Sequence, residues 1–247
     1  MASGLRVPPS FLSGLKALFP ESSHIPQKAV FGNPWYIVAA VAFSASNRPE
    51  AVPQVFQYVL EDLKSNQNAS DSSNAEGKVV AQKLREALFK SGLTSGYPKA
   101  INALKSLHEC MPEEWKETQL QRNPDKSLAD YSSAGDNLFN AIYGQTATSV
   151  QTLLDSIYPD MGWFSKTIGY GLVYGHTESL SPLETSYTLV AALIAVNTPQ
   201  QITWHLDGAQ RNGATLEEVK AVRQVSMEVA KFSGVQWQHP VPEVRSV

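Results

Sequence analysis

Apolar residues recur at helical spacing along most of the chain, and the strict alternation of a half-buried strand is almost absent. The strongest helix starts lie in the last third. Ser181-Pro182-Leu183-Glu184 combines a capping box with a proline at the first helical position, and Thr198-Pro199 repeats that start. Thr215 begins a third helix after Gly213. Together these signals predict helices over residues 182–196, 199–212 and 216–233.

Apolar periodicity predicts further helices in the first two thirds, bounded by glycine, proline and polar clusters. A mostly polar stretch at 111–133 interrupts them, with Trp115 and Tyr131 as candidate anchors. We therefore expect an all-α fold in which this stretch links two helical halves. The expected helices of this part cover residues 10–18, 34–47, 50–65, 76–92, 97–109, 134–157 and 160–177.

The two halves resemble each other at low resolution. Residues 35–42 and 187–194 are both rich in small apolar residues, and each segment is followed by an asparagine, a proline and an amphipathic stretch. Small residues at this spacing let helices pack closely, and the repeated pattern predicts an internal duplication. We expect a single domain over 1–247, with a degenerate first repeat at about 30–110, a linker at about 111–133 and a second repeat at about 134–244.

Net charge and hydropathy limit the binding partners and the cellular location that we expect for this protein. The net charge of −3 and the pI near 6.0 argue against binding to nucleic acid or to an anionic membrane, because both need a basic surface. No apolar run approaches the ~18–20 residues that span a bilayer, and the start of the chain lacks a signal-peptide layout. We expect a cytoplasmic protein, with mitochondrial or peroxisomal location as the alternatives. The last residues, Arg245-Ser246-Val247, differ from a Ser-Lys-Leu peroxisomal address.

Cys110 is the only cysteine in the sequence. A lone cysteine cannot form an internal disulfide, a Cys-x-x-Cys redox pair or a thiolate metal cluster. Histidines and carboxylates also lack the spacing of metal ligands. We therefore expect neither a metal nor a cofactor.

The segment most suggestive of chemistry runs from Thr198 to Val219 and reads TPQQITWHLDGAQRNGATLEEV. It places Trp204 and His205 in the middle of a helix, ahead of small residues, an Asn-Gly helix end and a capped acidic helix start. This segment resembles the signature of the carboxymuconolactone decarboxylase-like family. Residues 76–80 and 95–103 of the first half carry a weaker echo of it, and the late segment around 234–244 is most similar to fungal members.

The resemblance implies the compact helical fold of the alkylhydroperoxidase-D-like proteins. It also implies that His205 is the catalytic acid/base, because loss of CO₂ from a lactone acid leaves an enolate that must be stabilised and protonated on carbon. An imidazole that titrates near neutral pH can do both. The alternative is that His205 is an interior histidine that joins two helices. The cysteine-dependent peroxidases of the same fold need a Cys-x-x-Cys pair, so that activity is excluded here.

Other candidate residues surround this histidine in the sequence. The family's decarboxylases carry a glutamate where this chain has Ser186, and Glu184 lies close enough in the sequence to replace it; the alternative role of Glu184 is to complete the capping box. We expect substrate contacts from Trp204, Ser186, Tyr187, His176 and Tyr97, with core packing or a solvated helix end as the alternative for each aromatic or imidazole ring.

The predicted function is therefore that of a cofactor-independent lyase or isomerase. It would act on a small activated carboxylic acid or lactone, with one site per chain and a homo-dimeric or homo-trimeric assembly. The alternative is a catalytically inactive family member that binds a small ligand or serves as an oligomeric scaffold.

Overall fold

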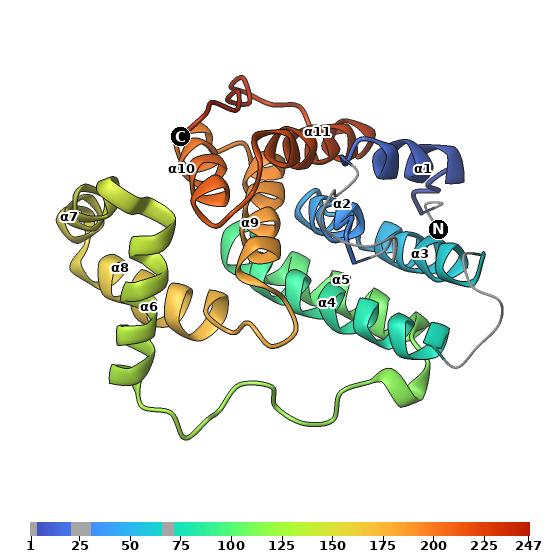
Figure 1. The fold of residues 1–247 in the computed structure, drawn as a ribbon, viewed down its shortest axis with the longest axis horizontal. Coiled ribbons are helices and arrows are strands. Elements are labelled where there is room, and N and C mark those ends of the chain that lie inside the picture. Colours follow the sequence, from blue (N-terminus) through green and yellow to red (C-terminus); the bar gives the residue numbers. More distant parts are fainter. Residues whose placement is uncertain (1–3, 21–30, 66–71) are drawn as a thin grey trace.

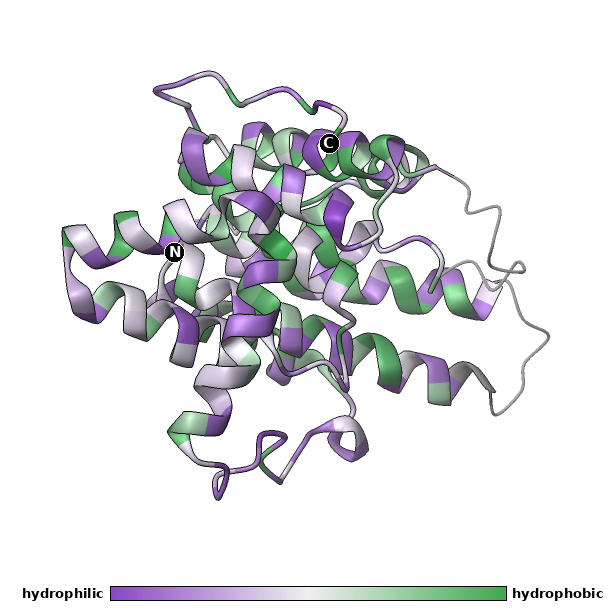
Figure 2. Cartoon of the chain, turned by 60° about the vertical axis from the view of Figure 1, so that its left-hand side comes forward, coloured by the Kyte–Doolittle hydropathy of each residue, from purple (hydrophilic) through white to green (hydrophobic). Residues whose placement is uncertain are grey.

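Helices make up all of the regular structure in the part of the chain that the computed structural model describes, residues 4–20, 31–65 and 72–247. No strand occurs in these ranges, and 74% of the described residues are helical, which confirms the all-α class. Apolar and polar turns alternate along the outer helices (Figure 2), as expected of amphipathic helices around a buried core. The first helices are α1 (Pro9–Ala17), α2 (Trp35–Ala45), a 3₁₀ turn η1 (Pro49–Ala51), α3 (Val52–Ser65), α4 (Ser72–Ser95) and α5 (Tyr97–Cys110).

The chain then crosses to its second half through the linker, which contains a 3₁₀ turn η2 (Glu113–Trp115). Both predicted anchors, Trp115 and Tyr131, are buried. The later elements are α6 (Leu128–Tyr143), a 3₁₀ turn η3 (Gly144–Thr146), α7 (Ala147–Ile157), α8 (Pro159–Phe164), a π-helix η4 (Ser165–Tyr174), α9 (Pro182–Val196), α10 (Pro199–Arg211) and α11 (Leu216–Phe232).

Helices α2 and α9 form the centre of the molecule and pack against each other (Figure 1). Every residue of α2 is buried, and α9 is buried from Glu184 to Ala195. Alanines on both helices allow close approach of the two backbones. The small-residue segments noted in the sequence, 35–42 and 187–194, therefore lie in the two central helices of the core.

Corresponding helices of the two halves occupy corresponding places around this central pair. Helix α4 packs against both α2 and α9, and so does α11. Both central helices end in an asparagine in the left-handed region, Asn47 with φ 58° and Asn197 with φ 57°. This arrangement is what an internal duplication would produce, and the duplication stays a prediction. His205 follows Asn197 at the same separation at which the buried Val55 follows Asn47, so the described part of the first half offers no histidine at that place.

Elements α6, α7, α8 and η4 build a separate lobe with its own apolar cluster, which reaches Leu189 of α9 and Trp204 of α10. Two helices predicted for this region differ from the structure. The helix expected over 134–157 is broken by the 3₁₀ turn at Gly144, where φ is 55°. The helix expected over 160–177 is the short α8 followed by the π-helix, a form that sequence periodicity does not distinguish from an α-helix.

Two glycines explain how η4 lies against α6. A Cβ added at Gly135 of α6 would collide with the backbone oxygen of Lys166, and one added at Gly171 of η4 would collide with the backbone oxygen of Tyr131. The two helices therefore approach to backbone contact, which fixes the side chains that they carry on either side of the contact.

We expect Gly135→Ala to lower the free energy of unfolding by about 1–3 kcal/mol, because the added methyl group must force α6 away from η4. Gly14→Ala is the matched control. Gly14 is an exposed helical residue of α1 whose added Cβ would meet nothing within 4 Å, so the change should stabilise the protein by about 0.5–1 kcal/mol. Urea titrations followed by circular dichroism measure both changes. Equal effects of the two substitutions would contradict the close contact.

Candidate functional site

Helix α10 brings Trp204 and His205 against α6. Its start is the predicted one at Thr198-Pro199, and its core-facing side buries Ile202, Leu206 and Ala209. The imidazole ring of His205 meets the ring of Tyr143 edge-on with 5.9 Å between centroids, and the indole of Trp204 meets the same phenol at 5.8 Å. Trp204 and His205, the two residues of the predicted motif, therefore both contact Tyr143, a residue that the sequence did not single out.

Tyr143 belongs to a tyrosine cluster formed with Tyr170 and Tyr174 of the π-helix. The hydroxyl of Tyr170 donates a hydrogen bond of 2.9 Å to the hydroxyl of Tyr143, and the hydroxyls of Tyr174 and Thr94 lie 3.0 Å apart. Burial raises the pKa of Tyr143 and of Tyr170 above the usual value, and it raises the pKa of Tyr174 to about 12. All three phenols are therefore neutral, proton-bearing groups at physiological pH.

His205 is buried, with 8% of its surface exposed, and its imidazole makes no hydrogen bond within the described residues. Its ring nitrogens are not among the enclosed, unpartnered polar atoms, so they stay in contact with accessible space. Burial lowers the pKa of His205 to about 4. The imidazole is neutral at pH 7, which departs from the titration near neutral pH that we expected from the sequence. Neutral imidazole offers one N–H donor and one acceptor.

Glu184 is engaged elsewhere. Its carboxylate accepts a hydrogen bond from the backbone N–H of Ser181 at 2.9 Å, which completes the capping box, and it pairs with Nζ of Lys83 at 2.6 and 2.7 Å. No hydrogen bond joins it to His205 among the described residues. The capping alternative describes Glu184 correctly, because a carboxylate at the third position of a helix is drawn to the free N–H groups of its own start.

Ser186 and Tyr187 also have structural partners. The hydroxyl of Ser186 donates to the backbone oxygen of Pro182 and accepts from the side-chain amide of Asn212, a bond of 2.8 Å that fastens the end of α10 to α9. Tyr187 packs in the main core, with its ring edge-on to Phe19, and burial raises its pKa. Side chains at different positions of α9 point in different directions. Tyr187 packs in the main core, whereas Leu189 of the same helix packs in the separate lobe with the tyrosine cluster.

The remaining predicted contacts lie apart from one another. Tyr97 is 64% exposed at the start of α5, so its ring lies in solvent and not in a cavity wall. His176 is half-buried just beyond the π-helix. Burial is the main reason that its pKa is lowered, and its Nε2 has no hydrogen-bond partner among the described residues. Seven residues were predicted for the site. Two of them, Trp204 and His205, lie against the tyrosine cluster.

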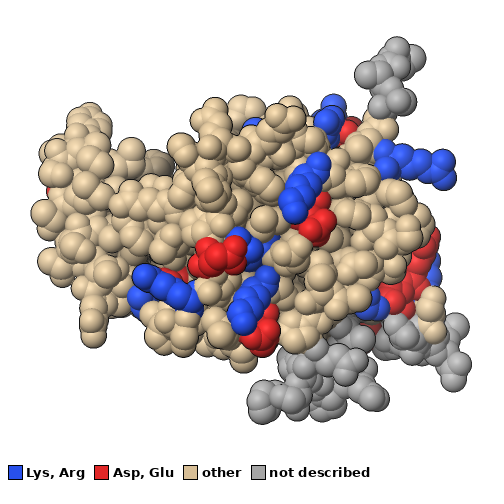
Figure 3. All heavy atoms as spheres, turned by 90° about the horizontal axis from the view of Figure 1, so that it is seen from above, with Lys and Arg blue, Asp and Glu red and all other residues tan. Residues whose placement is uncertain are grey.

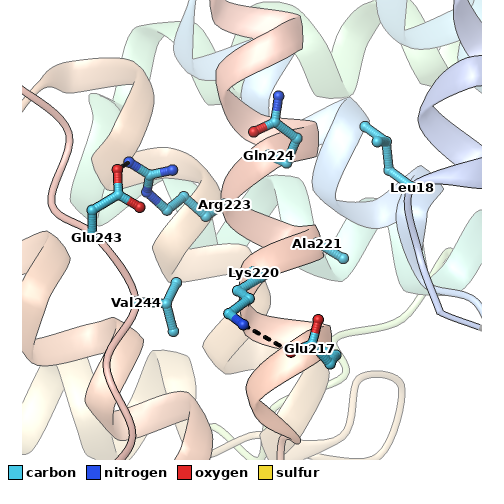
Figure 4. Close-up of a pocket in the computed structure, with 8 residues that line it drawn as sticks. All are labelled: Leu18, Glu217, Lys220, Ala221, Arg223, Gln224, Glu243 and Val244. Carbon is cyan, nitrogen blue, oxygen red and sulfur yellow. Dashed lines mark hydrogen bonds and ion pairs between the residues drawn. The ribbon is translucent and has the colours of Figure 1, made fainter.

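A surface pocket of about 340 Å³ lies between α11, the C-terminal segment and Leu18, and it shares no lining residue with the tyrosine cluster (Figure 4). Its charges are already paired: Lys220 lies 2.8 Å from Glu217, and Arg223 lies 2.6 Å from Glu243. The described residues contain no group of three or more His, Cys, Asp or Glu side chains that could hold a metal ion. None of the helices in those ranges is long and apolar enough to cross a membrane.

Two curated relatives match nearly the whole chain, whereas no family model matches it. The protein named Peroxisomal protein 2 of Schizosaccharomyces pombe is 32% identical over 202 residues, which cover 82% of this chain and 88% of that protein. The protein of the same name from Saccharomyces cerevisiae is 29% identical over a gapped alignment of 261 positions, which covers 85% of this chain and 92% of that protein. The chain belongs to the Peroxisomal protein 2 family.

Lys90 is fully buried in this member of the Peroxisomal protein 2 family, and the sequence did not predict its burial. Lys90 of α4 donates from Nζ to the backbone oxygens of Tyr174 and His176, at 3.1 and 2.7 Å, and to the hydroxyl of Thr185 at 2.8 Å. These three bonds use every proton of its ammonium group. Burial lowers the pKa of Lys90 to about 8, in spite of the nearby carboxylate of Glu86. Lys90 therefore fastens the end of the π-helix to α4 and α9.

In this Peroxisomal protein 2 family member, the linker also binds the end of the π-helix. Arg122 donates to the backbone oxygens of Leu172 and Val173 and forms a two-bond ion pair with Glu86, with a shortest N–O distance of 2.6 Å. Charged residues of an amphipathic helix usually face water, so nothing in the sequence signals the burial of Lys90 and Glu86. The π-helix that carries two of the cluster's tyrosines is thus held from two sides.

We expect the free energy of unfolding to fall as the pH drops from about 6.5 to 4. The folded-state pKa of His205 lies below the unfolded-state value, so in this window the unfolded chain binds more protons, and the loss attributable to His205 should reach about 3 kcal/mol. The His205→Gln variant should lack this part of the pH dependence. Urea titrations of both proteins at several pH values measure the difference, and parallel curves for the two proteins would contradict the buried neutral imidazole.

Proposed function

We propose that this chain is a cofactor-independent lyase or isomerase that acts on a small activated carboxylic acid or lactone at His205 and Tyr143. One observation carries the proposal: the buried imidazole of His205 has no hydrogen-bond partner among the described residues, and it lies beside the buried phenol of Tyr143, whose proton has no acceptor among them. Buried polar groups nearly always have partners. An imidazole that lacks partners and has accessible nitrogens, beside a phenol that accepts one hydrogen bond but donates none, is the arrangement expected where a ligand supplies the missing bonds.

His205 acts in this proposal as a neutral hydrogen-bond donor. When the bond between a substrate carbon and its carboxylate breaks, CO₂ leaves and the electron pair stays on the carbon as an enolate. The N–H of a neutral imidazole can stabilise the enolate oxygen, and its low pKa makes that donor resistant to protonation at neutral pH. This is an electrostatic role, and it replaces the acid/base role that the family resemblance implies.

Tyr143 is the proposed proton source. Tyr170 donates a hydrogen bond to its hydroxyl oxygen, which stabilises the phenolate that forms when Tyr143 gives its proton to the enolate carbon. Solvent then returns a proton to the phenolate. In an isomerisation the acceptor nitrogen of His205 would take a proton from one carbon, and Tyr143 would give its proton to another carbon of the same enolate. Solvent would then carry the proton from the imidazolium to the phenolate, and no CO₂ is lost. The resemblance of residues 198–219 to the carboxymuconolactone decarboxylase-like signature favours the first of these reactions.

A second candidate is a binding protein without chemistry. The observation in its favour concerns Glu184 and Ser186, which lie near or at the sequence position of the glutamate in the family's decarboxylases. Both side chains bind other helical residues of the protein. His205 and Tyr143 would then bind a small acid without breaking a covalent bond in it.

The test is a panel of small lactone acids and 3-oxo acids incubated with the protein in D₂O, with CO₂ and product deuterium as the readouts. We expect turnover to place one deuterium on carbon, and we expect His205→Gln and Tyr143→Phe to lower the rate by about 10²–10³-fold. Glu184→Gln is the control. It keeps the cap but loses the ion pair with Lys83, so the rate should be retained while stability falls by about 1 kcal/mol.

Unchanged rates in both site variants would contradict the proposed chemistry. Binding of panel members that depends on His205, with neither CO₂ release nor deuterium uptake, would favour the binding protein. A loss of rate in Glu184→Gln equal to that in His205→Gln would restore the catalytic role that the sequence predicts for this carboxylate.

We also propose a peroxisomal location, because both relatives carry that organelle in their name. The full chain, fused at its N-terminus to a fluorescent protein, should coincide with a peroxisomal marker in a fungal cell. Diffuse cytoplasmic fluorescence or coincidence with mitochondria would contradict this location.

A further inference from the structure

Helices α7 and α8 form a hairpin, residues 147–164, that we call the arm. It lies at the end of the lobe away from α1–α5 (Figure 1), and its main packing partners are α6, η3 and the π-helix. Six large apolar side chains of the arm are exposed within residues 153–164. The exposed fractions are 39% for Leu153, 66% for Ile157, 58% for Tyr158, 46% for Met161, 53% for Trp163 and 42% for Phe164.

This apolar surface is large for a protein that stands alone. The three aromatic side chains present about 300 Å² of exposed surface, if a ring residue buries about 150–250 Å² when covered. The three aliphatic side chains bring the exposed apolar surface of the arm to roughly 500 Å² in total. Scattered exposed apolar residues need no explanation, but six within one hairpin do.

Charge is almost absent from the same surface. Between residues 137 and 165 the sequence contains two charged residues, Asp155 and Asp160, and no lysine or arginine. Asp155 accepts a hydrogen bond of 2.7 Å from Gln151 of its own helix. Viewed from above, the end of the molecule that carries α7 shows hardly any charged side chain, whereas charges gather over the rest of that face (Figure 3). Depletion of charge with enrichment of aromatic residues and methionine is the composition of an interface core.

From these observations we propose that the arm is the contact surface for the arm of a second copy of this chain, related by a two-fold axis. Two patches of roughly 500 Å² bury about 1,000 Å² of apolar surface, which is the apolar share of a standard interface of about 1,200–2,000 Å². Each arm carries Asp155 and Asp160 and no cation, so it offers no positive charge to an acidic partner. An anionic bilayer would instead call for lysines and arginines beside the patch.

The arm also has a direct connection to the proposed site. Phe164 of α8 is followed at once by Ser165 of the π-helix, which carries Tyr170 and Tyr174. Contact between two arms would therefore order the start of the element that holds the tyrosine cluster, on both copies of a dimer. The dimer contact stands independently of the chemistry, because it rests on the exposed surface alone.

Light scattering during size-exclusion chromatography of the full chain, over a dilution series, tests the proposal. The wild type should have the mass of a dimer, and Ile157→Glu or Trp163→Glu should each raise the dimer dissociation constant by about thirtyfold or more. Leu120→Glu is the matched control, because Leu120 is 78% exposed in the linker and far from the arm in sequence. It should leave the mass unchanged.

Three results would overturn the proposal: a monomeric wild type throughout the series, arm variants that remain dimeric, or flotation of the wild type with phosphatidylcholine vesicles that the arm variants lose. If an arm variant misfolds, hydrogen exchange of the wild type decides. Residues 153–164 should exchange more slowly at high concentration than at low concentration, and equal exchange at the two concentrations would count against the arm contact.

Discussion

The close packing of α2 on α9 is the constraint on which the rest of the structure depends. Both helices are buried on every side, so each must satisfy its polar groups within the protein and at its own ends. The capping box at Ser181, the left-handed asparagines and the bonds from Asn197 to the segment around His239 all serve this purpose. Helix α10 starts directly after this second asparagine. The position of His205 is therefore fixed by the end of α9 and not by a flexible loop.

The candidate site lies where this rigid centre meets the separate lobe. One wall, with Trp204 and His205, belongs to α10; the other, with Tyr143 and Tyr170, belongs to α6 and the π-helix. Buried charges join the two parts: Lys90 and Arg122 bind backbone oxygens at the end of the π-helix, and Glu86 pairs with both cations. A buried ion pair is costly unless all its hydrogen bonds are made. Their completeness here suits a role in holding the π-helix at one position, which a preorganised site requires.

Much of the fold could be predicted because its signals are local. Helix α9 begins and ends where Ser181-Pro182 and Asn197 place it, and the all-α class follows from periodicity alone. The break at Gly144 could not be predicted, because a single glycine inside a helical pattern is often tolerated. The π-helix lies in backbone contact with α6 at Gly171, and a contact of this kind leaves no signal in local periodicity. For the site, sequence resemblance selected Trp204 and His205, but not the tyrosines, whose separation along the chain hides their proximity. Two roles were predicted for Glu184, in a cap and in a reaction, and the structure shows it in the capping box and in an ion pair with Lys83.

The central claim is that His205 is a neutral, ligand-ready imidazole held beside Tyr143. Nitrogen-15 NMR of the labelled histidines tests it most directly, with the resonances of His205 assigned by their loss in His205→Gln. The account predicts that His205 has the shifts of a neutral imidazole at pH 7 and keeps them down to about pH 5, because burial lowers its pKa to about 4. It also predicts that a small lactone acid shifts these resonances. An imidazolium signal from His205 at pH 6, or resonances that no acid of the panel disturbs, would contradict it.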